Sequence, residues 1–137
     1  MMDGVANMRE VWAGEAGDVR WKILVERGEG GEVLSFVRRE LGPAHATSGM
    51  GGPALTPGHM VNVWTGVATG LPPFILVRTA AAVLSVTVQL DRGDPIELHL
   101  SPVIDEFGLR FAASPLPDDA QVIDLQICHD PNQRRRS

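Results

Sequence analysis

The most regular alternation of apolar and polar residues lies between residues 83 and 100. Its first half places Leu84, Val86, Val88 and Leu90 between polar residues, and its second half does the same with Ile96, Leu98 and Leu100. The sequence Asp91-Arg92-Gly93-Asp94-Pro95 between the halves is typical of a turn. A period of two on each side of a turn predicts a β-hairpin with one buried face and one solvated face.

Similar patterns predict further strands before and after this hairpin. They cover residues 19–26, 60–69, 109–113 and 123–127, with a short extended piece at 74–77. Residues 32–41 fit either a helix, through a helical stripe of apolar residues, or the return arm of a hairpin from 19–26. The glycine-rich sequence at 27–31 favours the hairpin, so we predict a strand there.

About seven short strands separated by glycine and proline turns are typical of an antiparallel sandwich. We therefore predict an all-β fold: a single antiparallel β-sandwich, immunoglobulin-like in general shape, over residues 18–130. Residues 1–17 lack a period and are expected to form a flexible segment, and residues 131–137 a basic tail that contains Arg134, Arg135 and Arg136. Residues 42–58 hold five glycines and three prolines, which predicts a long surface loop.

The strand pattern over residues 19–127 resembles small β-sandwich modules of uncharacterised actinobacterial proteins. The resemblance rests on Gly66-Val67-Ala68, on the alternating valines and leucines of the 83–100 hairpin with Asp91 and Gly93 in its turn, and on Gly108-Leu109-Arg110-Phe111-Ala112-Ala113. It implies the fold and no established activity. It also implies cysteines near the second strand and the glycine-rich loop, where this chain has Leu34 and Met50.

Composition narrows the classes of function. The 137 residues carry a formal net charge of −5, which argues against a broad nucleic-acid surface. Cys128 is the only cysteine, so neither an internal disulfide nor a cysteine-based zinc site is expected. No signal peptide and no stretch long enough to span a membrane is recognisable, which favours a cytoplasmic protein. Lys22 is the only lysine among 12 basic residues, a bias typical of GC-rich bacterial genomes.

Reactive residue types do not form a recognisable catalytic or metal-binding pattern. The four histidines lack metal-ligand spacing, and no serine lies in a Gly-x-Ser-x-Gly elbow. The adjacent carboxylates at 105–106 and 118–119 are placed as turn residues, and Arg92-Gly93-Asp94 is explained by turn chemistry. Residues 47–52 lack the lysine and the helix of a phosphate-binding loop. We therefore predict no cofactor and no metal.

Without a catalytic pattern, a non-catalytic binding or protein-interaction module with an unknown protein partner is the leading hypothesis. Trp12, in the N-terminal segment, and His45, Ser48 and His59, around the 42–58 loop, are its candidate interaction residues. The alternative is a small enzyme whose site forms between the 42–58 loop and the 105–106 turn. A homodimer through an exposed strand edge is a third hypothesis. Trp21 is expected in the core, and Trp64 is expected to face outward or to cover a sheet end.

Overall fold

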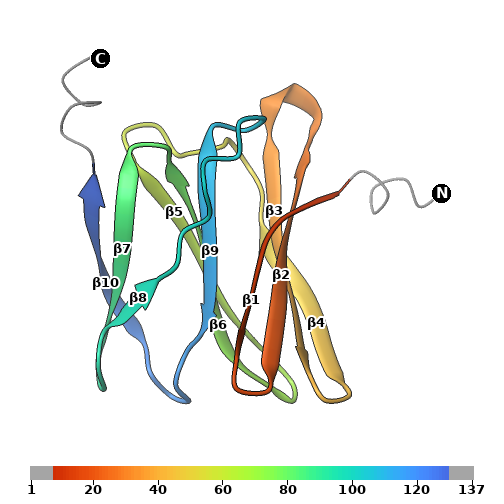
Figure 1. The fold of residues 1–137 in the computed structure, drawn as a ribbon, viewed down its shortest axis with the longest axis vertical. Helices are drawn as coiled ribbons and strands as arrows, with labels where there is room; N and C mark the ends of the chain where they lie inside the picture. The colour runs from red at the N-terminus through yellow and green to blue at the C-terminus, as the bar shows by residue number, and fades with distance from the viewer. Residues whose placement is uncertain (1–7, 130–137) are drawn as a thin grey trace.

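The computed structural model describes residues 8–129 and consists of antiparallel β-strands (Figure 1). A single turn of 3-10 helix, η1 (Glu29–Gly31), joins the second and third strands. The ten strands are β1 (Arg9–Ala16), β2 (Val19–Arg27), β3 (Val33–Leu41), β4 (Ala44–Met50), β5 (Val61–Ala68), β6 (Leu71–Ala80), β7 (Val83–Leu90), β8 (Ile96–Leu98), β9 (Leu109–Pro115) and β10 (Val122–His129).

The strands form three open sheets that lie side by side in Figure 1. One outer sheet has the order β1-β2-β3-β4, the central sheet β5-β6-β9, and the other outer sheet β10-β7-β8. The first two sheets are aligned, because β1 and β2 lie against β9, β3 against β6, and β4 against β5. The central sheet is thus sandwiched between two others.

Burial follows from this layering. The first core layer, between the β1–β4 sheet and the central sheet, contains Ile23, Val25, Val33, Val37, Phe74, Leu76, Leu109, Phe111 and Ala113. The second core layer, on the opposite face of the central sheet, contains Ile75, Val77, Val83, Val86, Val88, Leu90, Leu98, Ala112 and Leu116. Successive residues of β6 enter alternate layers, which explains why the run Phe74-Ile75-Leu76-Val77 is apolar without interruption.

The predicted all-β, antiparallel fold is confirmed. The 83–100 hairpin forms with Val86 opposite Leu98 and Val88 opposite Ile96. Residues 33–41 are a strand paired with β2, as predicted. Ten strands in three sheets replace the seven strands expected for a two-sheet sandwich. No helix among residues 8–129 is long and apolar enough to cross a membrane.

Two segments expected to be irregular are strands instead. Residues 9–16 form β1, which pairs with β2 along its length and has a register shift between Glu10 and Trp12 that hides its alternation. Residues 44–50 form β4, whose mostly small residues pair with β3. The loop expected over 42–58 is therefore limited largely to 51–60. The predicted basic tail at 131–137 lies outside the described residues.

Candidate functional site

Trp12 packs against the body of the protein. Its indole Nε1 donates a hydrogen bond to the backbone carbonyl of His99, 3.0 Å away, and its ring lies against the first core layer. Trp12 therefore joins β1 to the segment after β8. These contacts assign it a structural role, and its predicted role in recognition stays a prediction.

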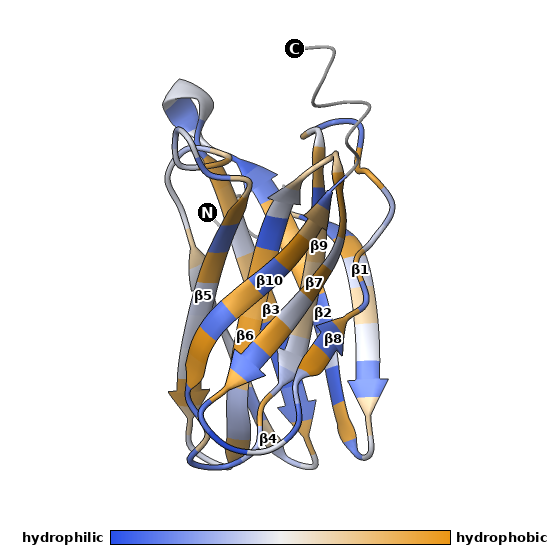
Figure 2. Ribbon diagram, turned by 90° about the vertical axis from the view of Figure 1, so that its left-hand side faces the viewer, coloured by the Kyte–Doolittle hydropathy of each residue, from blue (hydrophilic) through white to orange (hydrophobic). Residues whose placement is uncertain are grey.

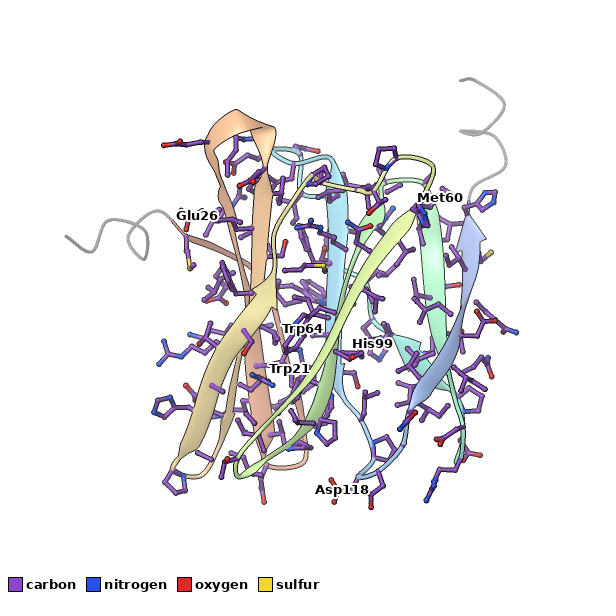
Figure 3. All side chains as sticks on the ribbon, turned by 180° about the vertical axis from the view of Figure 1, so that it is seen from behind. Trp21, Glu26, Met60, Trp64, His99 and Asp118 are labelled. Carbon is purple, nitrogen blue, oxygen red and sulfur yellow. The ribbon has the colours of Figure 1, made fainter. Side chains whose placement is uncertain are left out.

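The structure separates the other three candidates. His45 is exposed on β4, across from Glu40 and beside the β3–β4 turn. His59 directly precedes Met60, which Figure 3 shows at the opposite end of the molecule. The Ser48 side chain faces Arg39, and its hydroxyl accepts a hydrogen bond from that residue. The two histidines that flank the predicted loop therefore do not meet.

Within residues 8–129, the side chains that the enzyme hypothesis requires do not lie together. Glu106 is held by Arg9, with Nη1 and Oε1 2.6 Å apart, and Asp119 occupies a turn with φ of 62°. In this part of the chain no histidine side chain bonds to a carboxylate or a serine hydroxyl. No group of three or more metal-ligating side chains is found there either. Among the described residues, the segment after β4 and the 105–106 turn therefore do not bring an acid–base pair together.

Arg78 is a fully buried residue that was not anticipated from the sequence. It lies on the face of β6 that carries Phe74 and Leu76, so its guanidinium enters the first core layer. Nη1 donates to the Val33 carbonyl (2.6 Å) and to Ser35 Oγ (2.9 Å), and Nη2 donates to the carbonyls of Gly51 (2.9 Å) and Pro53 (2.7 Å). Arg78 thus ties the start of β3 and the segment after β4 to the central sheet.

Arg39 is equally buried but far less well bonded. Nη2 donates to Ser48 Oγ at 3.0 Å, and the guanidinium carbon lies 5.4 Å from the Trp64 ring and 5.7 Å from the Phe74 ring. Nε and Nη1 have no partner among the described residues. Burial lowers the pKa of both Arg39 and Arg78. In the described chain neither forms a salt bridge with a carboxylate.

Two tryptophans complete the surroundings of Arg39. Trp64 is half-buried and packs on the first core layer, which corrects the expectation that it faces outward or covers a sheet end. Trp21 packs on the same layer, as expected, and meets Phe74 edge-to-face with ring centroids 5.5 Å apart. Arg39 therefore interacts chiefly with aromatic faces, which attract a cation electrostatically.

Replacing Arg39 with methionine is expected to change the free energy of unfolding by less than about 1 kcal/mol. The variant loses one hydrogen bond and two cation–π contacts, but it removes a buried charge with two unpartnered nitrogens and keeps an apolar stem of similar length. Urea unfolding followed by tryptophan fluorescence measures the difference. Arg38→Met, at the exposed neighbouring position, is the control. A loss of about 3 kcal/mol in Arg39→Met alone would show that the buried guanidinium stabilises the fold.

A long stretch without charge is the second unanticipated feature. Between Glu40 and Asp91 the only charged residue is Arg78, and it is buried. The stretch includes all of β4, β5, β6 and β7. The exposed parts of these strands therefore carry no Asp, Glu, Lys or Arg side chain in a protein whose net charge is −5. The pattern is visible in the sequence, and it marks surface that loses no charge hydration on contact with another protein.

Exposed apolar side chains gather on one side of the molecule. Among residues 8–129, five large hydrophobic residues are exposed, and four of them lie on β5 and β10, which are edge strands of adjacent sheets. Their exposed fractions are 46% for Val63, 77% for Val67, 64% for Ile123 and 39% for Ile127. Figure 2 shows β5 and β10 on the same side, with hydrophobic bands along both. We call this surface the open side.

A hollow of about 520 Å³ lies at one end of the open side. Its walls come from Thr65, Gly66 and Val67 of β5 and from residues 119–122, which lead into β10, and Phe74 and Leu116 line it as well. A second hollow, of about 430 Å³, lies over β1, β2 and β3. Its lining holds three basic and two acidic residues, and each basic side chain lies within 4 Å of a carboxylate: Arg20 and Arg38 near Glu40, and Lys22 near Glu10. The open side is therefore the stronger candidate for recognition.

Comparison of the chain with family models, with curated proteins and with solved structures finds no match. The resemblance to actinobacterial β-sandwich modules accordingly stays a prediction.

Proposed function

We propose that this protein is a non-catalytic protein-interaction module that binds an extended polypeptide segment along the free edge of β5. The observation that carries the proposal is the character of this strand. It has eight residues, VNVWTGVA, with no charge and no proline, and its valines at 63 and 67 are exposed. An edge strand of this kind presents unpaired backbone groups to which another strand can add.

The other free edges are less suited to strand addition. β1 carries Arg9, Glu10 and Glu15 and a register shift. β8 has three residues, β9 ends in a proline, and β10 has two register shifts. β4 has no Asp, Glu, Lys or Arg, but apart from His45 and Met50 its side chains are small. Charges, bulges and short length are the devices by which natural sheets block their edges. β5 has one register shift as well, between Gly66 and Ala68 near its end, but it combines a free edge with exposed apolar side chains and no charge.

A peptide with alternating valine and threonine, labelled with fluorescein, provides a defined probe. We expect the protein to raise the anisotropy of this peptide, and we expect a version N-methylated at alternate residues not to bind, because it lacks the backbone donors that strand addition requires. Val63→Glu should weaken binding about tenfold or more, since it places a charge where the peptide removes water. Leu84→Glu, at the exposed apolar residue outside the open side, should leave binding unchanged.

The outcome that would refute the proposal is equally specific. If the N-methylated peptide binds as tightly as the unmodified one, backbone pairing does not hold the peptide. If Leu84→Glu weakens binding as much as Val63→Glu, the contact is not at β5.

A further inference from the structure

We infer that the segment bound by β5 is the β5 strand of a second copy of this protein, in an antiparallel pair related by a two-fold axis at Thr65. This inference rests on the proposed function, because it names the partner of the same edge. The pair would extend the central sheet across two subunits. A two-fold interface requires a surface that is complementary to itself, and β5 meets this requirement in its residue pattern.

Pleat geometry restricts the possible registers. Cross-strand partners must lie on the same face of the sheet, so residue numbers that pair across the axis must have an even sum. When Thr65 lies opposite the partner's Thr65, Val63 lies opposite the partner's Val67. By symmetry, Val67 lies opposite the partner's Val63 on the other side of the axis. Each exposed valine of β5 in one subunit is therefore covered by an exposed valine of the partner strand. A shift of the axis to Trp64 would place Val63 opposite threonine instead.

Charge favours a second copy over an acidic or basic partner. Two molecules of net charge −5 repel each other, so their contact is most favourable where neither presents an ionised side chain. The long uncharged stretch between Glu40 and Asp91 supplies such a surface around β5. A basic partner would gain nothing from this strand, because it holds no carboxylate. Ile123 and Ile127 on β10 extend the apolar surface toward the neighbouring sheet.

Cysteine cross-linking tests the position of the axis. In a Cys128→Ser background, which removes the exposed native thiol, Thr65→Cys places two thiols opposite each other. Mild oxidation should then give a disulfide-linked dimer, since opposite Cα atoms in an antiparallel pair lie about 4.5–5.5 Å apart. Thr69→Cys is the matched control: it is exposed just beyond the same strand, yet the two copies would lie roughly 20 Å or more apart.

Sedimentation velocity measures the unmodified pair. We expect the intact chain to show a concentration-dependent dimer that Thr65→Glu weakens about tenfold or more, because two carboxylates would face each other across the axis. Leu84→Glu should leave the dimer unchanged. Raising the salt concentration from about 50 mM to about 500 mM should strengthen the dimer or leave it unchanged, because salt screens the repulsion between acidic subunits and the contact contains no ion pair.

The results separate this inference from the proposed function. If the chain remains a monomer but binds the valine–threonine peptide with the expected sensitivity, β5 serves a different protein and the second-copy inference is wrong. If Thr65→Cys cross-links no faster than Thr69→Cys, the register is wrong and the inference falls. If salt weakens the dimer, charged surfaces hold it and β5 does not. Selective cross-linking at residue 65, together with loss of the dimer in Thr65→Glu, supports the inference.

Discussion

Replacing Arg78 with methionine is expected to lower the free energy of unfolding by about 3–5 kcal/mol. Methionine fills most of the same volume, but it leaves the buried acceptors of β3 and the part-buried carbonyls of residues 51 and 53 without their donor. The side chain donates four hydrogen bonds, to three backbone carbonyls and one hydroxyl. Hydrogen bonds to a charged group are individually strong. A buried carbonyl that loses its partner destabilises the folded state, because it has lost its hydrogen bonds to water and gained none in return. Urea unfolding of the two proteins gives the difference directly.

The comparison with Arg39→Met makes this prediction specific. Both arginines are fully buried in the first core layer, so loss of buried charge and loss of side-chain volume are similar in the two variants. They differ in bonding, because Arg39 has one hydrogen bond and Arg78 has four. Arg78→Lys should also destabilise, since a single ammonium cannot replace the planar fork that reaches acceptors on two sides. Equal stability losses for the two methionine variants would show that hydrogen bonding does not set the difference.

Alternation located most of the strands because their burial has a period of two. In the 83–100 hairpin, Val86, Val88 and Leu98 are buried as the pattern requires. Residues 33–41 were ambiguous, but Val33 and Val37 lie on the buried face of a strand and Ser35 and Arg39 complete that face. Position in the pleat, more than residue type, therefore decided which side chains entered the core.

The sequence does not indicate the three-sheet arrangement, because β6, the middle strand of the central sheet, does not alternate. The run Phe74-Ile75-Leu76-Val77 predicts only a short extended piece, yet an uninterrupted apolar run is what a strand buried on both faces requires. β4 was missed for the opposite reason, since its small residues give no hydrophobic signal at all. Arg78 is charged and follows the apolar run directly, and nothing local distinguishes a bonded core arginine from a solvated one.

The candidate surface was predictable only in part. The hypothesis of contact through a strand edge was available from the sequence, and so was the absence of charge between Glu40 and Asp91. The sequence favours His45, Ser48 and His59 only because they are polar and lie near a predicted loop. The open side instead consists of valines and isoleucines whose strand pattern is the same as that of core residues. Only the spatial order of the sheets shows that β5 and β10 are edges.

Replacing Gly49 with alanine is expected to lower the free energy of unfolding by about 3 kcal/mol. Gly49 lies in β4 opposite Phe36, and an added Cβ would sit 1.9 Å from the Ser35 carbonyl oxygen and 2.7 Å from the Phe36 Cα. Both are backbone atoms of β3, so a rotamer change cannot relieve the overlap. The β3–β4 pair must separate locally, which disturbs Ser35, a hydrogen-bond acceptor of Arg78. Thermal and urea unfolding measure the loss.

Gly28→Ala is the matched control for this variant. Gly28 has a φ of −90°, which alanine adopts without strain, and its nearest neighbours are side-chain atoms of Glu32 that can move. We expect a change within about 0.5 kcal/mol, because less freedom in the unfolded chain offsets a mild contact. If Gly49→Ala were as stable as Gly28→Ala, the backbones of β3 and β4 would have to lie farther apart at Gly49 than they do in this structure. The position of β4 against β5, and with it the shape of the uncharged surface, would then need revision.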